Sequence, residues 1–595
     1  MPEIQIPLVK GQGKSSKTAD YVDLLPTNIV PIVGEAEGAA GYFRFWPGLA
    51  KVADVAGVSR GSHWNTVKDA AYRVMGGKLY LGSQSVGDVS GSGRVSMAHG
   101  RTSQAVVVNG HLKLYRYDGE VKTVSNWPAN EVFPGETKTI QTTQHNKDGD
   151  TLKITASNEA GELTLTVTPT NGNNKSGAPL SIAESVWKTG GSESQVAPSA
   201  GIPYITDLKV SGTKFAGATL LVTYTFNPNP LTPGSPTAAE ERDISKLVWV
   251  QVTQTTTVPN QQYPILETTP ILDVCRYRGR YYFSFAGTDT FMLTSLDDES
   301  KPDLIAAEYR AESMPDGILA LRDHREFVVA FGSSTIEFFK LTSDANNPLA
   351  NASSYNVPIG IAGQFCVADF ADTFAFITSP ARGQVIVAMM GQGTYQQISD
   401  RNTNKILSEC TKAELAGSFV ESLKTDDNQF LIIHLPRHTL VYNATSGLWS
   451  ILKTGLGDNT HRAIDYRNEG DTVTCGDRLS PFLGKHDLTT SAQYGEDQEI
   501  ILYSPLVGVE KSVMYDMQIT ANSGLSSNVR RIFVSSTSDG INYGNEEAIE
   551  FDGPWQWLRR AIKRRVGRIR LRIGFKLRIV GATPCTLSNF RARIE

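Results

Sequence analysis

The chain has few of the residues and segments that mark several protein classes. Its 595 residues include only five cysteines, widely spaced and without a CxxC pair, so neither a disulfide framework nor a zinc knuckle is indicated. No uncharged apolar run reaches the roughly 18 residues of a membrane-spanning helix, and the first residues lack the apolar stretch of a signal peptide. We therefore expect a protein with no membrane span that folds in a reducing compartment and is not exported by a signal peptide.

A strong net charge is also lacking. The 57 Lys and Arg residues nearly balance 61 Asp and Glu, which leaves a formal net charge of -4. This balance excludes a protein that coats nucleic acid through bulk positive charge. Hydrophobic residues make up 40% of the chain, and its length suggests about four units at roughly 150 residues each. The chain can therefore bury real cores.

Complete catalytic and metal-binding motifs are absent as well. Residues 57–61 match the GxSxG pattern around Ser59, but a turn and a strand are expected to follow instead of the helix that this motif requires. His434 and His438 have the spacing of a helical zinc pair, yet Pro436 lies between them and favours a hairpin. The chain has no P-loop, no dinucleotide fingerprint and no HExxH. We expect no catalytic residue, no cofactor, no metal site and no enzymatic activity.

Short runs of alternating apolar residues, separated by Gly, Asn or Asp turns, fill most of the chain. Three clear hairpins turn at residues 76–77, at residues 109–110 and near Gly279. Outside residues 131–267 the hairpins begin roughly every 35 to 55 residues, which is the blade period of a β-propeller. A set of β-sandwiches would show the same alternation, so that alternative stays open.

We predict a mainly β fold with a β-propeller core, an inserted Ig-like β-sandwich module and a C-terminal β-sandwich-like region. Residues 1–130 supply an N-terminal arm and the first blades, and residues 268–494 supply the remaining blades. Residues 131–267 interrupt the period, are rich in Thr, and contain the proline-rich stretch 227–241, which cannot enter a central strand. Residues 495–595 form the C-terminal β-rich region with a cationic strand.

One helix is predicted over residues 411–424. Thr411 and Glu414 have the spacing of a capping box. The residues from Leu415 to Leu423 then place apolar side chains on one helical face.

The most unusual feature is a cationic run near the end of the chain. Residues 553–594 contain no Asp or Glu, and residues 568–578 alternate between one face with Arg568, Arg570, Arg572, Lys576 and Arg578 and one face of apolar residues. On one strand these cations would lie about 6.8 Å apart on one face, and each neighbouring pair would repel by about 0.6 kcal/mol in water. The candidate protein-interface row consists of Arg559, Arg560, Arg564, Arg565, Arg568, Arg570, Arg572, Lys576 and Arg578.

Three kinds of partner can offset this repulsion. Glu546, Glu550 and Asp552 share one face of a neighbouring strand and can pair with the row inside the chain. An acidic surface of a partner protein can also face the row, as can the phosphates of a nucleic acid, which suit the planar fork of arginine. All three alternatives stay open.

Several long strings resemble one known family. They are GDVSGSGRVSMAHGRTSQAV (87–106), YDGEVKTVSNWP (117–128), DDESKPDLIAAEYRAESMPDG (297–317), FGSSTIEF (331–338), LIIHLPRHTLVY (431–442) and RVGRIRLRIGFKLR (565–578). These strings are similar to the packaged-DNA stabilisation protein, which is the tail hub, or nozzle, of short-tailed enterobacterial phages. The resemblance is collinear over residues 1–130 and 268–595, whereas residues 131–267 are expected to have no counterpart in the family.

The resemblance implies a structural virion protein of the phage tail that is assembled in the host cytoplasm. Such proteins form a homo-oligomeric ring, expected to be a hexamer, below the portal and adaptor proteins. The ring closes the exit channel of the packaged double-stranded DNA and mounts the tailspikes and the tail needle. The alternative is a β-propeller that binds carbohydrate or processes glycans, which requires carboxylates, or Tyr and Arg side chains, to converge at one end.

Overall fold

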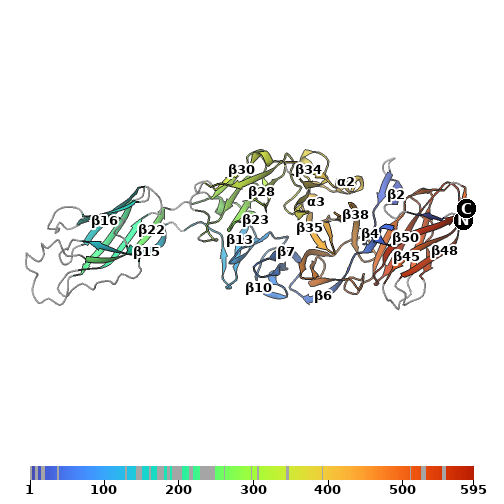
Figure 1. The fold of residues 1–595 in the computed structure, drawn as a ribbon, viewed down its shortest axis with the longest axis horizontal. Coiled ribbons are helices and arrows are strands. Elements are labelled where there is room, and N and C mark those ends of the chain that lie inside the picture. Colours follow the sequence, from blue (N-terminus) through green and yellow to red (C-terminus); the bar gives the residue numbers. More distant parts are fainter. Residues whose placement is uncertain are drawn as a thin grey trace, which may run out of the picture. The chain divides into compact units, whose positions relative to one another are not determined.

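The chain divides into two compact units, which are described separately (Figure 1). Unit 1 consists of Met1–Ser125 and Ile265–Glu595, and unit 2 of Asn126–Pro264. The structure is a computed structural model, which describes residues 3–6, 11–14, 21–36, 39–127, 130–142, 151–159, 162–169, 180–183, 188–189, 204–212, 219–227, 248–259, 262–296, 298–303, 307–343, 348–391, 393–509, 511–523, 531–551 and 558–595. Within these residues no helix has the length and apolar character needed to cross a membrane.

Seven antiparallel blades make up most of the described part of unit 1, and this confirms the predicted β-propeller. Blades 1 and 2 consist of β7 (Ser59–Asn65), β8 (Ala70–Met75), β9 (Lys78–Leu81) and β10 (Gln84–Asp88), and of β11 (Met97–His99), β12 (Ser103–Val108), β13 (His111–Arg116) and β14 (Val121–Thr123). Blades 3 and 4 consist of β23 (Ile271–Tyr277), β24 (Arg280–Phe285), β25 (Thr290–Leu293) and β26 (Glu308–Arg310), and of β27 (Ile318–His324), β28 (Phe327–Gly332), β29 (Ile336–Leu341) and β30 (Leu349–Asn351). Blades 5 and 6 consist of β31 (Val367–Phe370), β32 (Thr373–Ile377), β33 (Val387–Met390) and β34 (Tyr395–Gln397), and of β35 (Phe419–Thr425), β36 (Asn428–His434), β37 (Thr439–Asn443), β38 (Leu448–Thr454) and the short β39 (Asn459–Thr460). Blade 7 consists of β40 (Ala463–Glu469), β41 (Thr472–Asp477), β42 (Phe482–Asp487) and β6 (Gly48–Asp54).

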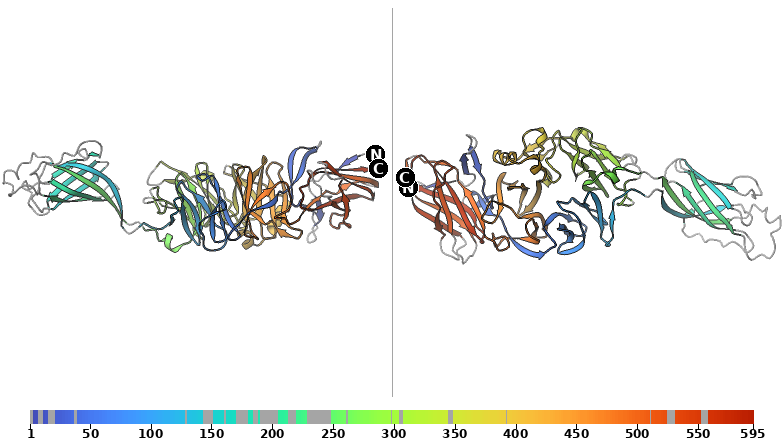
Figure 2. Two further views of the ribbon diagram at one scale, coloured as in Figure 1. Left: turned by 90° about the horizontal axis from the view of Figure 1, so that it is seen from below. Right: turned by 180° about the vertical axis from the view of Figure 1, so that it is seen from behind.

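Blade 7 closes the ring with a strand from the start of the chain. β6 pairs with β42 in antiparallel register, with Leu49 opposite His486 and Phe482 opposite Asp54. β40 in turn contacts β7 of blade 1. The blades surround one axis, as Figure 2 shows. Because the closing strand joins segments more than 400 residues apart in sequence, separating these segments would open the ring.

The predicted hairpin turns are present. Residues 76–77 connect β8 with β9, and Asn109-Gly110 connects β12 with β13. Asn109 has φ 50° and Gly110 has φ 78°. Two consecutive positive φ angles suit a two-residue hairpin turn, because its twist then matches that of the strands, and Asn-Gly is the preferred pair. The local sequence therefore sets the register of these blades.

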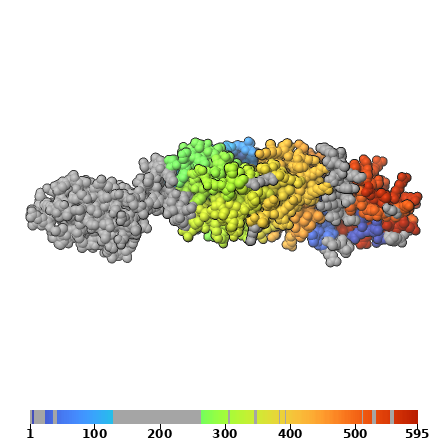
Figure 3. Space-filling model, turned by 90° about the horizontal axis from the view of Figure 1, so that it is seen from above, coloured from blue at the N-terminus to red at the C-terminus, as the bar shows by residue number. Residues whose placement is uncertain are grey.

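A β-sandwich forms the rest of unit 1, which confirms the expected C-terminal sandwich-like region. Its first sheet contains β1 (Glu3–Gln5), β4 (Ile29–Ala36), β5 (Ala39–Phe45), β45 (Ser512–Asn522), β48 (Leu558–Ile569) and β50 (Thr586–Ile594). Its second sheet contains β43 (Gln498–Tyr503), β44 (Val507–Gly508), β46 (Arg531–Thr537), β47 (Glu547–Glu550) and β49 (Arg572–Gly581). Residues 1–130 therefore contribute strands to the sandwich as well as to the propeller, and Figure 3 shows N-terminal residues, in dark blue, among the red C-terminal ones. A separate hairpin pairs β2 (Gly11–Lys14) with β3 (Tyr21–Leu24).

Apolar side chains from both sheets fill the sandwich. Met514 and Met517 of β45 share one core with Phe575 and Leu577 of β49, and each is at most 1% exposed. Complete burial of such a side chain contributes about 1.5 to 3 kcal/mol. The alternation predicted for the terminal strands therefore builds this core.

Unit 2 is a β-structure of its own. Its strands are β15 (Asn130–Thr142), β16 (Thr151–Glu159), β17 (Glu162–Pro169), β18 (Leu180–Ala183), β19 (Lys188–Thr189), β20 (Tyr204–Gly212), β21 (Thr219–Asn227) and β22 (Val248–Pro259). Hydrogen bonds join these strands into one sheet, in which β20 and β22 run parallel. An Ig-like domain has two facing sheets, so the Ig-like topology stays a prediction.

The helix prediction is only partly correct. The described helices are α1 (Ile265–Thr268), α2 (Arg401–Ser408) and α3 (Lys412–Ala416), with 3-10 turns η3 (Ser353–Tyr355) and η4 (Pro380–Arg382). The capping box between Thr411 and Glu414 is present. However, α3 ends at Ala416, and the predicted continuation is the innermost strand β35 of blade 6. The prediction of a helix over residues 411–424 is therefore wrong beyond the first turns, and it missed α2.

Candidate functional sites: an axial cavity and a cationic strand pair

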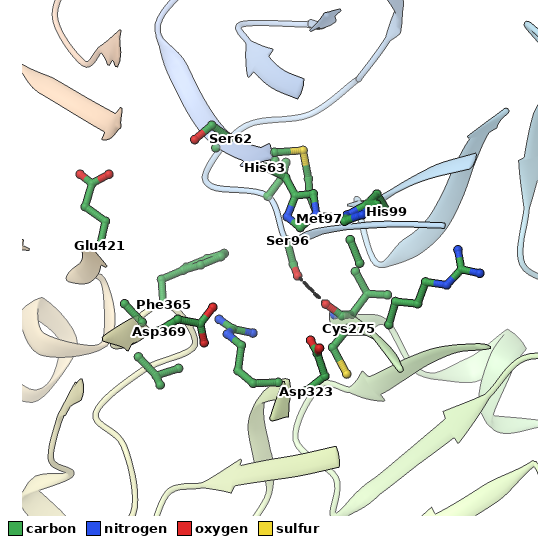
Figure 4. Close-up of a pocket in the computed structure, with 18 of the residues that line it drawn as sticks. Ser62, His63, Ser96, Met97, His99, Cys275, Asp323, Phe365, Asp369 and Glu421 are labelled. Atoms are coloured by element: carbon green, nitrogen blue, oxygen red, sulfur yellow. Dashed lines mark hydrogen bonds between the residues drawn. The ribbon is translucent and has the colours of Figure 1, made fainter. Parts of the chain in front are cut away.

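The innermost strands of the seven blades enclose a cavity of about 550 Å³. Each of these strands contributes to its lining, and polar and charged residues together make up more than half of it. Figure 4 shows His63 and His99 on one side of the cavity and Asp323 and Asp369 on the other. The cavity is thus a polar space on the propeller axis.

Ion pairs and hydrogen bonds at the cavity wall connect neighbouring blades. Arg94 donates to the Asp465 carboxylate at 2.5 Å, and Ser59 donates to the same group at 2.6 Å. Burial opposes the ionisation of Asp465, but Arg94 and Ser59 outweigh it and lower the pKa of this carboxyl. On the opposite side of the cavity, Arg322 of β27 donates to the buried Asp273 of β23 at 2.7 Å. These pairs hold blade 7 to blade 1 and blade 3 to blade 4.

Glu421 and His434 form a second buried pair in blade 6. The distance between His434 Nε2 and Glu421 Oε1 is 2.5 Å, and the backbone N–H of Tyr466 donates to the other Glu421 oxygen at 2.9 Å. Arg478 donates to His434 Nδ1 at 2.7 Å. Because arginine is always a donor, Nδ1 must accept, and Nε2 carries the proton that faces Glu421. Burial, followed by the charge of Asp465, raises the pKa of Glu421 to about 7.

Two histidines and two aspartates line the cavity without strong ion pairs. His63 Nε2 lies 2.7 Å from His99 Nδ1, and burial lowers the pKa of His63 to about 3, so this histidine is neutral. Asp323 and Asp369 are accessible to water, although the surrounding protein raises the pKa of both carboxyls. The described residues contain no group of three His, Cys, Asp or Glu that could hold a metal ion.

The candidate catalytic serine and the candidate zinc-binding histidines lie in strands and hairpins of the propeller. Ser59 is buried at the start of β7 and donates to Asp465, so within the described residues its partner is a carboxylate and not a histidine base. His434 ends β36 and His438 precedes β37, as expected for a hairpin around Pro436. These contacts stabilise the propeller and assemble no nucleophile, base and oxyanion donor.

The predicted cationic strand is two strands, which corrects the single-row prediction. β48 ends at Ile569, residues 570–571 form a turn, and β49 begins at Arg572. β48 pairs with β45 in the first sheet, whereas β49 pairs with β43 and β46 in the second. In the predicted row, β48 contains Arg559, Arg560, Arg564, Arg565 and Arg568, the turn contains Arg570, and β49 contains Arg572, Lys576 and Arg578. The cations therefore lie on two sheets.

The cations of β49 are satisfied within the chain, as one of the three alternatives predicts. Glu546 accepts from Arg578 Nε at 3.1 Å and lies 3.5 Å from Lys576 Nζ. The hydrogen bond to Glu546 raises the pKa of Arg578. Arg572 donates to the backbone oxygen of Ser538 at 3.2 Å. Glu550 pairs with Arg531 instead of the row, and Asp552 lies outside the described residues.

The cations of β48 behave differently. Arg559 is 1% exposed and lies over the ring of Phe551. Arg564, Arg565, Arg568 and Arg570 are exposed and form no ion pair with another described residue. These four arginines are called the basic edge below, because β48 is the edge strand of its sheet. The role of the row as a protein interface stays a prediction.

Comparisons with known proteins agree with both parts of unit 1. Residues 4–159 and 243–491 match the family described as "Bacteriophage P22 Gp10, beta-propeller", and residues 499–595 match "Bacteriophage P22 Gp10, beta-sandwich". The chain is 38% identical over 602 residues to the tail hub protein gp10 of Salmonella phage P22, with all of both chains covered. The chain belongs to the phage tail hub family. The family is that of a structural virion component and not that of an enzyme.

The propeller family model also matches both ends of residues 131–267, up to residue 159 and from residue 243, and leaves residues 160–242 unmatched. The expectation that the segment has no counterpart in tail hubs is therefore wrong at its two ends. For residues 160–242 it stays a prediction.

Similarity to solved structures is remote. An exo-beta-1,3-galactanase from Phanerochaete chrysosporium is 8% identical with a TM-score of 0.21, and covers 55% of this chain and 82% of its own. PorZ from Porphyromonas gingivalis is 7% identical with a TM-score of 0.24, and covers 92% of this chain and 76% of its own. At such TM-scores neither protein supports a functional argument for this tail hub.

Proposed function

We propose that the chain is a subunit of a homo-oligomeric ring, with six copies by family resemblance, that retains the packaged genome in a phage virion. The ring docks below the portal and adaptor proteins in the tail, closes the DNA exit channel, and mounts the tailspikes and the tail needle. The observation that supports this proposal is the 38% identity over the full length of a tail hub protein.

The structure suits a mechanical role. The propeller is closed by β6, and buried ion pairs join its blades, so the subunit resists deformation by its partners. Retention requires many simultaneous contacts, because multivalent docking raises the effective affinity without any bond chemistry. The formal net charge of -4 also suits the wall of a channel for DNA, since a strongly cationic wall would hold the phosphates.

The remaining steps follow from the same role. We expect the subunits to assemble in the host cytoplasm after packaging, and the double-stranded DNA to pass through the ring at genome ejection. No observation favours the alternative of a carbohydrate-binding or glycan-processing propeller over the tail hub.

Genetic removal of the protein tests the proposal. Particles that are assembled without the chain should package DNA and then lose it, and purified protein should restore retention. The measurement is the fraction of nuclease-accessible DNA, with electron microscopy of the tails to locate the chain. Particles that keep their DNA without the chain would contradict the proposal, as would a location outside the tail.

A further inference from the structure

Charge is divided unevenly along this chain. Residues 553–594 carry twelve Lys and Arg and no Asp or Glu, so the other 45 Lys and Arg share the chain with all 61 Asp and Glu. The C-terminal segment therefore has a formal charge of +12 and the remainder a formal charge of -16. A chain that is nearly neutral as a whole thus carries a strongly basic end on an acidic body, and a second copy supplies the complement of each.

The basic edge is built to face outward. In the pairing of β48 with β45, Gly567 lies opposite Met514 and Arg564 lies opposite Asp516, so β48 has one more residue than β45 between these pairs. This is a β-bulge, and Arg565 within it has φ 59°. Bulges re-aim side chains at sheet edges. The bulge accompanies a run of exposed arginines from Arg564 to Arg568.

The charge of the basic edge is only partly offset locally. The nearest acid in the pairing is Asp516, which already forms two hydrogen bonds with Arg593 of β50. Asp516 of β45 lies opposite Arg564 of β48 on one side and opposite Arg593 of β50 on the other, so one carboxylate faces two arginines. An exposed Leu571, 56% accessible, extends the surface at the adjoining turn. Arginine beside apolar area is typical of protein interfaces.

The propeller carries a matching acidic surface. The first hairpin of each blade starts with an innermost strand, and neighbouring innermost strands run in the same direction around the axis, so the first turns share one end of the propeller. In blades 5, 6 and 7 these turns carry Asp372, Asp427 and Asp471, whereas the turns of blades 2, 3 and 4 carry Arg101, Arg278 and Arg325, so only one side of this end is acidic. All three are exposed, and none forms an ion pair with another described residue. We call them the acidic turns.

The backbone of the first turns accommodates charged residues. Asp372 and Asp427 have φ 59° and 58°, and Arg278 and Arg325 in the turns of blades 3 and 4 have φ 43° and 52°. Asp adopts positive φ more readily than most residues with a Cβ, so these turns hold exposed carboxylates at little cost in backbone strain.

We propose that the basic edge of one copy docks on the acidic turns of a second copy of this chain. The contact is heterologous, since different surfaces meet, and repetition of a heterologous contact with suitable rotation closes a ring. The inference rests on the ring in the proposed function and names the surfaces through which its subunits meet. Arginine favours this contact because its planar fork binds a carboxylate with two hydrogen bonds.

Charge reversal on each surface, separately and together, tests the contact. Arg564→Glu with Arg568→Glu reverses the basic edge, and Asp427→Lys with Asp471→Lys reverses the acidic turns. Sedimentation velocity of the full chain should show self-association at about 50 mM salt that weakens as added salt shortens the screening length. Each double variant should weaken self-association at least tenfold, and the quadruple variant should restore it.

A matched control and a folding control accompany these variants. Lys78→Glu with Lys412→Glu makes the same change in net charge as the basic-edge variant at exposed positions away from both surfaces, and should leave self-association unchanged. Thermal unfolding should be unchanged in all variants, because the altered side chains are exposed.

Three results would overturn the inference. They are a wild-type chain that stays monomeric at low salt, double variants that associate like the wild type, and a quadruple variant that is not restored. None of them contradicts the tail location or DNA retention, which particles test independently. In the first case, binding of the basic edge to another acidic tail protein or to DNA becomes the alternative.

Discussion

Buried charges at the propeller axis connect blades through single residues. Asp465 has a side chain that is only 2% exposed, and Arg94 is its ionic partner. Removal of one member of a buried pair leaves an uncompensated charge, which typically costs about 3 to 5 kcal/mol. We expect Arg94→Ala to lower the free energy of unfolding by about 3 kcal/mol, measured by chemical denaturation. Replacement of both residues, by Arg94→Leu with Asp465→Asn, should cost less than the single change, and an equal or larger cost would contradict the explanation.

The raised pKa of Glu421 predicts a pH dependence of stability. The folded chain holds this proton up to about pH 7, whereas an unfolded glutamate releases it near its ordinary pKa of 4.5. The stability that this carboxyl contributes is therefore complete below about pH 4.5 and is lost as the pH rises through 7. We expect Glu421→Gln to reduce the fall in stability between pH 5 and 8 by about 2 kcal/mol, measured by denaturation at each pH. The same substitution at the exposed Glu409 should not change the slope, and a wild-type chain without such a fall would contradict the prediction.

At the scale of elements, the sequence predicted the hairpins better than their assembly. Turns such as Asn109-Gly110 are encoded locally, so they could be recognised without a structure. The closure of blade 7 could not be recognised from the sequence, because β6 and β42 are distant in sequence and each shows the same alternation as any other strand. The number of blades could not be predicted either, because the innermost strand β11 of blade 2 has only three residues, too few to show an alternating pattern.

Two other elements show why local patterns misled. The apolar residues from Leu415 to Leu423 fit a helical face, yet the second half is the buried innermost strand of a blade, so tertiary packing overrides the pattern. In the cationic segment the alternation is correct within each strand. The chain nevertheless changes sheet at Arg570-Leu571, and this pair is not a recognised turn signal.

Ring closure depends on the close packing of one glycine in β6. A Cβ on Gly48 would lie 2.4 Å from the backbone oxygen of Ala492 and 2.7 Å from that of Thr490. The same glycine donates its N–H to Thr490 at 2.9 Å. We therefore expect Gly48→Ala to destabilise the chain by about 1 to 3 kcal/mol through overpacking, measured by thermal unfolding. Hydrogen exchange should increase first in β40, β41 and β42.

The control for this change is Gly508→Ala. A Cβ at Gly508 meets nothing within 4 Å. This variant should unfold like the wild type. Equal stability of the two variants would contradict the close packing described for Gly48 in β6.

At the scale of the whole molecule, unit 2 begins and ends beside the same few residues. Asn126 Nδ2 donates to the backbone oxygen of Tyr263 at 3.2 Å, and the N–H of Tyr263 donates to Asn126 Oδ1 at 3.0 Å. Gln262 Nε2 donates to the backbone oxygen of Trp127 at 2.8 Å. The two strands of chain that enter and leave the unit are thus held together at its base, as in an insertion that folds by itself.

This base predicts the result of removing the unit. Replacement of residues 128–261 by a short Gly-Ser linker leaves Trp127 and Gln262 within linker reach, so unit 1 should stay soluble and keep its unfolding temperature. The shortened chain should also restore a tail hub in particles that lack the full one. Removal of blade 3, residues 271–310, by the same design is the matched control and should abolish cooperative unfolding, because a propeller ring cannot close without one of its blades. An insoluble or unfolded shortened chain would show that the propeller needs unit 2 to fold, whereas a folded chain that fails in particles would place a tail contact on unit 2.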